Sequence, residues 1–421
     1  MHITVNYSTK EVIDMVEAGV CTPQILYLNA RIQAYQKECE QEIRMWLDKM
    51  NAEKELTDIS HKMRWIEDNV PKVTRIYLQR IVLKQSYNVL MKGKNNYKTI
   101  TDIGIVVEKE DITEKYEGWL NVWKKQSEKL KELDISVFET HAHYQLPVYS
   151  KVRKPLLHCL AEANIKKIII PAISFESNLK MKEWYDSAQY NKFVYYSFGL
   201  HPKCISKNWE QEWSEKRWTW FEKILLDHKC VAVGEVGLDF SVDPDEEILK
   251  LQEKAFRSFI QRANDYKKPV IIHLRPLDIG DDVLRKDIAS TLVDKLKKTA
   301  FEVLDKFSIQ NGAVLHCFTG NFDDMKNFTK VGVTHFGIGP KVFYNRQLQE
   351  AVSRMDERQL VIETDAPFLK LESGSIPNTS LVLFEVAEKI AELRGVSVEH
   401  ILKATYTNAL ELFSGCNREG E

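Results

Sequence analysis

The chain has 421 residues, enough for two or three domains and a large buried core. Hydrophobic residues make up 44% and charged residues 29%, a balance that excludes a disordered or membrane-embedded protein. The formal net charge of −2 excludes a polycation, so any nucleic acid would have to be bound by local patches or metal ions.

The cysteines and the first residues indicate the compartment. Seven cysteines, an odd number without a C-x-x-C pair, are typical of a reduced, intracellular protein. Residues 1–20 carry acidic side chains and no long apolar run, so we predict no signal peptide. No later stretch is apolar for long enough to span a bilayer. We therefore expect a cytoplasmic protein without a membrane partner, and a nuclear location stays open.

Residues 1–134 are predicted to form a mostly α-helical extension. A capping box at 8–11 and a Thr-Pro pair at 22–23 each begin a helix. Further helical patterns end before Pro71, run from there to about Gly93, and occupy residues 111–133. Only residues 99–107 have a strand-like pattern.

Residues 135–421 change to short apolar runs that alternate with amphipathic helical segments such as 246–266 and 292–307. The eight runs are Val137–Thr140, Ile165–Pro171, Phe193–Gly199, Val231–Glu235, Pro269–His273, Gly312–His316, Val333–Ile338 and Leu360–Glu363. Eight β-α repeats in fewer than 300 residues predict an α/β fold, a (β/α)8 TIM barrel, with a doubly wound open sheet as the alternative.

Polar side chains gather at the carboxyl ends of these runs. They are His141 and His143, His201, Glu235 and Asp239, His273 and Arg275, His316, and Glu363 and Asp365. A single His at a strand end is usually structural, but the carboxyl ends of barrel strands converge on one face. A buried cluster of imidazoles and carboxylates is costly without a cation. Nitrogen and oxygen ligands without thiolate suit Zn, Mn, Fe or Mg.

The same segments resemble the TatD family of metal-dependent deoxyribonucleases, which are amidohydrolase-like barrels. The resemblance covers about residues 136–414, with the motifs in family order. It lies in 139–143, 199–202, 231–239, 269–275, 316–320 and 363–367, and in 407–409 with Phe413 near the C-terminus.

The resemblance implies a site with two divalent metal ions, of Mg, Mn or Zn. It implies that His141, His143 and Asp365 bind the first ion. Glu235 would bridge the two ions, and His273 and His316 would hold the second. Two cations with a bridging carboxylate can lower the pKa of a shared water and stabilise charge on a phosphate.

The remaining implied roles concern water and substrate. Asp365 would orient or deprotonate the water, and His201 would contact a substrate phosphate or the leaving oxygen. Arg275 would pair with a phosphate or hold a carboxylate, and both readings stay open. Glu363 would support a ligand histidine.

Four segments depart from the family pattern. Glu139 replaces an Asp, and Lys203 replaces a second His but can still meet a phosphate as a point charge. An acidic insertion at 276–290 follows a ligand strand, so we expect it over the barrel mouth, where it would limit substrate size. Residues 373–378 replace an expected basic run. These last two changes leave the metal ligands intact and bear on the substrate.

Three functions remain open from the sequence. The first is a nuclease that trims DNA, as the resemblance implies. The second is an amidohydrolase or esterase with the same metal site, acting on a small molecule or on aminoacylated RNA. The third is a non-catalytic binding module, which has no need of six retained ligands.

The extension offers a candidate partner surface. Residues 71–101 carry seven Lys or Arg and no Asp or Glu, with three tyrosines interleaved. The segment is either a solvated helix face or a basic track that guides nucleic acid, with the tyrosines stacking on bases. Docking of a protein partner or self-association is the remaining prediction for this extension.

Overall fold

The computed structural model describes residues 45–46, 48–50, 59–70, 112–177, 179, 193–241, 246–276, 286–371 and 376–417. The chain divides into two compact units, Met1–Lys115 and Tyr116–Glu421. In the first unit, helix α4 (Ile59–Asn69) matches the helix predicted to end before Pro71. Most of the extension lies outside the described residues, as do the basic segment 71–101 and residues 277–285 of the predicted insertion 276–290.

Helix α6 (Ile112–Lys131) matches the helix predicted at 111–133. Its residues Tyr116, Trp119, Leu120 and Trp123 recur at helical spacing and pack into the large core of the second unit. The compact unit that contains the barrel begins at Tyr116. The domain boundary at 134 stays a prediction.

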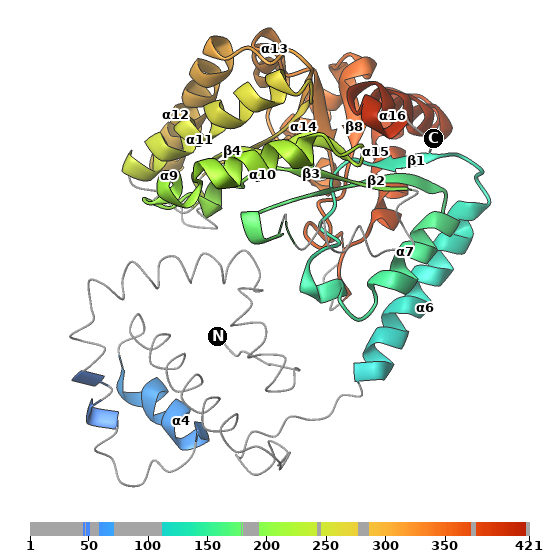
Figure 1. Cartoon of the computed structure of the whole chain (residues 1–421). Coiled ribbons are helices and arrows are strands. Elements are labelled where there is room, and N and C mark those ends of the chain that lie inside the picture. The colour runs from blue at the N-terminus through green and yellow to red at the C-terminus, as the bar shows by residue number, and fades with distance from the viewer. Residues whose placement is uncertain are drawn as a thin grey trace. The chain divides into compact units, whose positions relative to one another are not determined.

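Eight parallel strands form one sheet in the order β1 to β8, which confirms the predicted TIM barrel (Figure 1). They are β1 Val137–Glu139, β2 Ile165–Pro171, β3 Val194–Phe198, β4 Cys230–Asp239, β5 Val270–Arg275, β6 Ala313–Leu315, β7 His335–Ile338 and β8 Leu360–Ile362. The ring closes beyond the ends of β1 and β8. There the amide of Asp365 donates to the carbonyl of His141 (2.9 Å) and that of His143 to Ala366 (2.7 Å).

Among the residues that the structure describes, helices connect most successive strands and lie outside them (Figure 1). The α-helices are α7 Arg153–Glu162, α9 Trp209–Glu212, α10 Glu215–Leu225, α11 Glu246–Asp265, α12 Lys286–Lys306, α13 Phe322–Lys330, α14 Arg346–Arg354, α15 Leu383–Arg394 and α16 Val398–Leu412. The 3-10 turns are η2 Pro147–Tyr149, η3 Pro202–Cys204, η5 Pro340–Phe343, η6 Glu357–Gln359, η7 Ser380–Val382 and η8 Ser414–Asn417. Within the described residues, every helix is too short or too polar to cross a bilayer.

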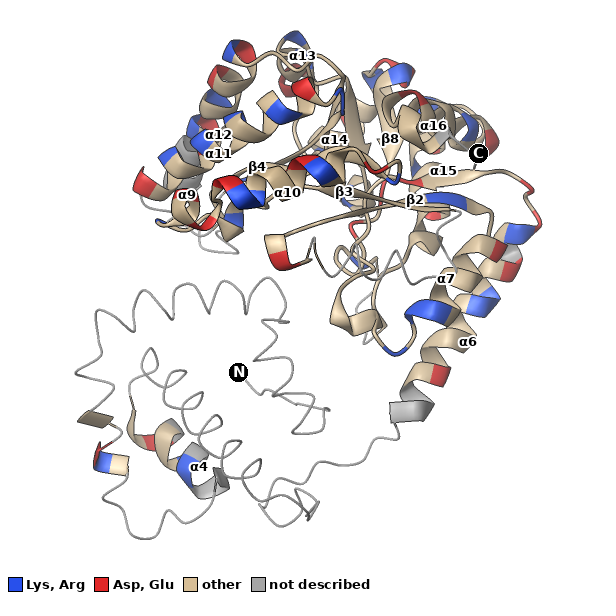
Figure 2. Cartoon of the chain, viewed as in Figure 1, with Lys and Arg blue, Asp and Glu red and all other residues tan. Residues whose placement is uncertain are grey.

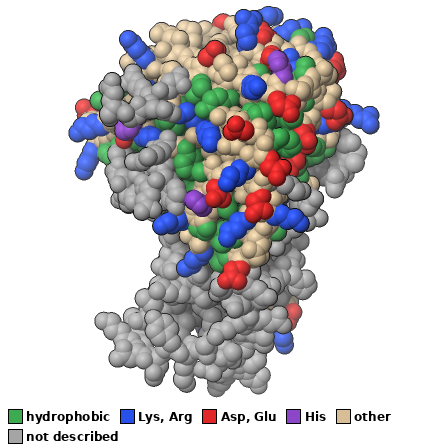
Figure 3. All heavy atoms as spheres, turned by 90° about the vertical axis from the view of Figure 1, so that its right-hand side faces the viewer, with side chains coloured by type: hydrophobic (Ala, Val, Ile, Leu, Met, Phe, Trp, Pro, Cys, Tyr) green, Lys and Arg blue, Asp and Glu red, His purple; other side chains and the backbone are tan. Residues whose placement is uncertain are grey.

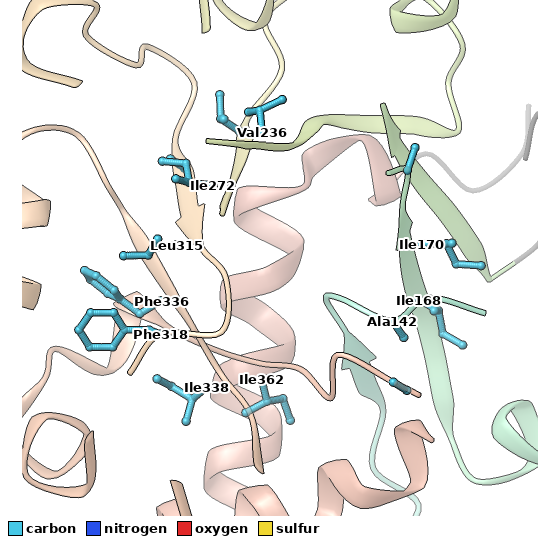
Figure 4. Close-up of a cluster of buried hydrophobic side chains, with 14 of the residues drawn as sticks. Ala142, Ile168, Ile170, Val236, Ile272, Leu315, Phe318, Phe336, Ile338 and Ile362 are labelled. Carbon is cyan, nitrogen blue, oxygen red and sulfur yellow. The ribbon is translucent and has the colours of Figure 1, made fainter. Parts of the chain in front are cut away.

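Alternate strand residues pack into two separate apolar layers, because successive strand side chains point to opposite faces. Ile168 and Ile170 of β2 join the core between strands and helices, drawn in Figure 4, whereas Ile169 joins a second cluster. That second cluster fills the barrel interior and consists of Phe138, Ile169, Tyr195, Val231, Ala232, Ile271, Val314, Val361, Ala409, Leu412, Phe413 and Cys416.

The interior layer explains where the polar residues lie. Ile271, Val314 and Val361 fill the barrel, and the residues two positions further along the same chains are His273, His316 and Glu363. Residues two apart on a strand share a face, so these side chains also point into the barrel. They lie next to the second apolar cluster, at the carboxyl ends of the strands, where the barrel opens. The outer helices instead carry interspersed basic and acidic side chains (Figures 2 and 3).

Candidate metal centre

The first group of donors comes from the segments that close the barrel. The Nε2 atoms of His141 and His143 lie 3.3 Å apart. Asp365 Oδ1 lies 3.3 Å from His143 Nε2 and 3.8 Å from His141 Nε2. Asp365 has a left-handed backbone, with φ 52°, which costs about 1–3 kcal/mol for a residue other than glycine. The closing hydrogen bonds of β1 and β8 hold it in this conformation.

Glu235 on β4 lies between two sets of histidines. Its Oε2 is 3.6 Å from His141 Nε2. Its Oε1 is 2.6 Å from His273 Nδ1 and 3.0 Å from His316 Nε2. The two oxygens of one carboxylate thus face different imidazoles, and the structure brings together all six predicted metal ligands.

The six donors suit a divalent cation. All are imidazole nitrogens or carboxylate oxygens, and Glu235 and the four histidines are buried. His141 and His316 are stacked with ring centroids 3.9 Å apart, and Nδ1 of His141 has no hydrogen-bond partner among the described residues. Such crowding of buried polar groups is unfavourable unless a cation draws the lone pairs together.

Charge in this site is already coupled. Burial acts against charge on Glu235 and His316, yet their mutual attraction outweighs it. The pKa of His316 is therefore raised and that of Glu235 is lowered. Ligand histidines must be deprotonated to hold a cation, so binding of a metal at this site would displace protons.

His273 is oriented by a residue that the sequence analysis did not assign. Asp239 Oδ2 lies 2.9 Å from His273 Nε2, which leaves Nδ1 to face Glu235. Asp239 also accepts a hydrogen bond from the amide of Ser241 (2.9 Å). Burial alone would raise the pKa of Asp239, but the hydrogen bond and charge of His273 lower it. The carboxylate therefore stays ionised and selects the tautomer of His273.

The sequence contained a signal for Asp239. Glu235, Gly237 and Asp239 alternate on one extended strand and so share a face. Gly237 has φ +145°, and a side chain there would collide with the His273 carbonyl, so glycine permits the close approach of β4 to β5. The strand runs four residues beyond the predicted Val231–Glu235 and brings Asp239 level with Arg275.

We expect Asp239→Asn to weaken metal binding by about 10–100-fold, the usual effect of removing a partner that orients a ligand histidine. The amide keeps the shape but not the charge that fixes the tautomer. Titration with Mn²⁺ by calorimetry measures this without any activity assay. An unchanged dissociation constant would show that Asp239 does not orient His273.

His316 has a weaker support of the same kind. Glu363 Oε1 lies 3.5 Å from His316 Nδ1 but accepts its hydrogen bond from the amide of Cys317, at 2.5 Å. The Glu363 side chain lies against Gly337, where any Cβ would collide with the carboxylate. The predicted support of a ligand histidine is therefore an electrostatic contact in this structure.

The predicted substrate residues lie around the metal-ligand cluster. His201 Nε2 is 3.6 Å from Glu235 Oε1, and burial lowers the pKa of His201 to about 3, so its imidazole is neutral. Lys203 Nζ is 3.7 Å from Asp239 Oδ2. Arg275 is exposed at the end of β5. His201 is thus adjacent to the metal ligands, and Lys203 is adjacent to the carboxylate that supports one of them.

We expect His201→Ala to lower kcat by about 10²–10³-fold, as one transition-state contact typically does, with metal content unchanged. His201 adjoins the metal-ligand cluster, but we assign it to the substrate. Steady-state kinetics with metal analysis measure both quantities. Loss of bound metal in this variant would instead make His201 a ligand.

Glu139 ties β1 to β8. Its carboxylate accepts hydrogen bonds from the amides of His141 (3.1 Å) and Thr364 (3.0 Å) and from the Thr364 hydroxyl (2.6 Å). The longer Glu in place of the family's Asp therefore spans the closing seam of the barrel. Burial raises the pKa of Glu139 from 4.5 to about 8, against the effect of these hydrogen bonds.

This shift predicts a pH dependence of stability. Between pH 4.5 and 8 Glu139 is protonated in the folded chain and ionised in the unfolded chain, so folding takes up a proton. The free energy of unfolding then falls as pH rises, by up to about 1.4 kcal/mol per pH unit. Glu139→Gln should remove this slope in urea unfolding between pH 5 and pH 8. Parallel curves for the variant and the natural chain would contradict the assignment.

Comparison with known proteins agrees with this geometry. The family model described as TatD related DNase matches residues 138–414, which is more than half of the chain. The chain belongs to this TatD family. It is 29% identical over 283 residues to the uncharacterized metal-dependent hydrolase YabD of Bacillus subtilis, covering 66% of this chain and 98% of that protein.

Other similar proteins come from Escherichia coli. The uncharacterized metal-dependent hydrolase YcfH is 27% identical over 280 residues, covering 65% of this chain and 94% of that protein. The crystal structure of the TatD homologue YjjV superposes with a TM-score of 0.55 at 25% identity, covering 66% of this chain and 98% of that one. Our chain is therefore a metal-dependent hydrolase of the TatD family.

Proposed function

We propose that the chain is a nuclease that hydrolyses phosphodiester bonds with two divalent cations, one on each side of Glu235. The observation that carries this is the division of the Glu235 oxygens between His141 on one side and His273 and His316 on the other. A bridging carboxylate of this kind is suited to a two-metal site. The nitrogen and oxygen donors suit Mg²⁺, Mn²⁺ or Zn²⁺.

The residues would divide the work by position. Bound cations would supply charge for a phosphate and lower the pKa of a water. Asp365 is 16% exposed, the most open of the six ligands, so it can reach a water and accept its proton. His201 is neutral and beside the cluster, so it can donate a hydrogen bond to a phosphate or to the leaving oxygen.

DNA is the proposed substrate and partner, as the name of the matching family model suggests. Trimming from an end is our proposal for the mode of cleavage. Hydrolysis of an amide or ester would use the same metal ligands, so it is the main alternative to cleavage of DNA. Guidance of nucleic acid by residues 71–101 stays a prediction, because those residues lie outside the described ranges. Docking or self-association through residues 1–134 also stays a prediction.

The test is incubation of the full chain with labelled single- and double-stranded DNA and RNA, each with Mg²⁺, Mn²⁺ or Zn²⁺. We expect cleavage of DNA that stops with chelator and falls by about 10²–10⁴-fold in Asp365→Asn, which separates intrinsic activity from a contaminating nuclease. Hydrolysis of amide or ester substrates without cleavage of any nucleic acid would overturn the proposed substrate and keep the metal chemistry.

A further inference from the structure

One aromatic ring stands open to solvent in the part of the chain that the structure describes. Tyr344 is 58% exposed, whereas every other Phe, Trp and Tyr side chain in the described ranges is buried or partly buried. A single exposed ring is common on protein surfaces, so its position and its neighbours decide what it can do.

Tyr344 lies on the catalytic face of the barrel. It directly follows η5, the turn that the chain enters on leaving β7 at its carboxyl end, so it shares the face that carries the metal ligands. The side chain of the next residue, Asn345, donates to the carbonyl of Thr319 at 3.2 Å. Thr319 comes three residues after the ligand His316. The segment with Tyr344 is therefore tied to the loop that carries a metal ligand.

The backbone at Tyr344 is held on both sides. Its amide donates to the carbonyl of Lys341 (3.3 Å), and Asn345 caps α14 by accepting a hydrogen bond from the amide of Leu348 (3.0 Å). Partial burial, and then the nearby Cys317 thiol, raise the pKa of Tyr344, so its hydroxyl stays neutral. A ring fixed in this way loses little freedom when a ligand packs on it.

Two cationic side chains flank the ring. Lys341 Nζ lies 5.9 Å from the centroid of the Tyr344 ring, and Arg346 begins α14 two residues further on. Neither forms an ion pair with a carboxylate of the described ranges. The carboxylates at the start of α13, Asp323 and Asp324, are already paired with lysines at 2.7 and 2.8 Å. This side of the barrel mouth therefore presents an aromatic face together with positive charge.

An exposed ring beside cations matches an unpaired nucleic-acid strand. Each base of such a strand has a flat face that can stack on an aromatic ring, and each phosphate carries a negative charge that an ammonium group can neutralise. In a duplex the bases are already stacked on one another, so their faces are not available to a side chain at the surface.

We propose that Tyr344 stacks on a base of single-stranded DNA, or of an unpaired DNA end, while Lys341 pairs with the adjoining phosphate. We call Lys341, Tyr344 and Arg346 the strand platform. The inference rests on the proposed nuclease function and gives that function a single-stranded substrate. Since β7 lies between the strands that lead to His316 and Asp365, a strand held here would lie next to the metal ligands.

The first test measures binding without cleavage. The full chain in chelator is titrated into a labelled single-stranded oligonucleotide, and fluorescence anisotropy gives the dissociation constant. We expect Tyr344→Ala to raise this constant about 10-fold, within the range of lost stacking, and Tyr344→Phe to change it less than about twofold. Lys341→Gln should lower the slope of its salt dependence by about 0.7, the effect of one phosphate contact. Equal losses in Tyr344→Ala and Tyr344→Phe would overturn stacking.

An oligonucleotide of the same length with only abasic sites tests the base contact directly. It keeps the phosphates and lacks the rings, so the natural chain and Tyr344→Ala should bind it with the same dissociation constant. A loss of affinity in Tyr344→Ala that persists on the abasic strand would show that Tyr344 does not contact a base.

Tyr266→Ala and Lys330→Gln are the matched controls. Tyr266 follows α11 and Lys330 ends α13, so both lie at the end of the barrel opposite to the metal ligands. Both variants should bind the oligonucleotide like the natural chain. Thermal unfolding confirms that each variant is folded. Losses of affinity in these controls as large as those in Tyr344→Ala and Lys341→Gln would overturn the strand platform.

The second test separates the strand platform from the proposed function. With a single-stranded DNA substrate, Tyr344→Ala should raise KM about 10-fold with kcat changed less than about twofold, as expected for uniform binding. Cleavage of DNA with an unchanged KM in Tyr344→Ala would overturn the platform and keep the nuclease. Binding that depends on Tyr344, by a natural chain that cleaves no nucleic acid, would overturn the nuclease and keep the platform. A natural chain that neither binds nor cleaves nucleic acid would overturn both.

Discussion

Glu235→Gln is expected to abolish hydrolysis at every substrate concentration, with a loss on the order of 10⁴-fold or more in kcat. The amide keeps the shape of the side chain but removes the negative charge that faces His141 on one side and His273 and His316 on the other. Loss of the one charge that bridges the two ions weakens the binding of both cations. Each 1.4 kcal/mol of lost transition-state stabilisation lowers the rate about tenfold. Saturating kinetics with metal analysis make the measurement.

The matched control is Glu357→Gln, because Glu357 precedes β8 and so lies at the opposite end of the barrel. It contacts His400 and Arg394 and should leave kcat and metal content unchanged. An active Glu235→Gln variant that keeps both ions would contradict the bridging role. A loss no larger than that of His201→Ala would mean that the metal ligands and the substrate residues have been exchanged in our assignment.

Asp365→Asn is expected to lower kcat by about 10²–10⁴-fold, the range of general acid–base catalysis, and also to weaken one cation. The side chain lies 3.3 Å from His143 and is the most exposed of the ligands, so one carboxylate serves both as donor and as proton acceptor. Kinetics at saturating Mn²⁺ separate the two effects. Excess Mn²⁺ restores the occupancy of the metal site, but it does not replace the proton acceptor that the variant has lost.

Hydrolysis by Asp365→Asn that recovers fully at high Mn²⁺ would make Asp365 a ligand only. Partial recovery of kcat, with a pH profile that is flattened on the acidic side, is the result expected for a residue that also accepts the proton.

Phe413 lies in the apolar cluster inside the barrel, beneath the metal ligands. Phe413→Ala should lower the free energy of unfolding by about 3–5 kcal/mol, which urea unfolding measures.

The barrel and its ligands could be predicted from the sequence because both follow from local patterns. Ile165–Pro171 was predicted with the bounds that the structure has. Lys166 and Lys167 interrupt the segment, but the apolar run Ile168–Ile170 that follows them is typical of a strand buried on both faces. The ligands followed because each ends such a run. His273 and His316 needed only the strand period and the rule that barrel ends converge.

Features that depend on contacts distant in sequence were not predicted. Asp239 orients His273 only because β4 runs on beside β5 after a shift in register between Val233 and Val236. Glu139 differs from the family by one methylene, and only the closing contact with Thr364 explains its place. Phe175 packs on Trp213 from a separate β-α unit, an arrangement that no periodicity indicates.

The most direct test of the two-cation site is a crystal structure of the full chain with Mn²⁺, with anomalous scattering to locate the ions. We expect two anomalous peaks, one on each side of Glu235, with donor atoms of the six ligands at about 2.0–2.6 Å. His273 should contact its ion through Nδ1, because Asp239 holds Nε2. A single peak bound without Glu235, or His273 and His316 turned away from the ions, would contradict the account.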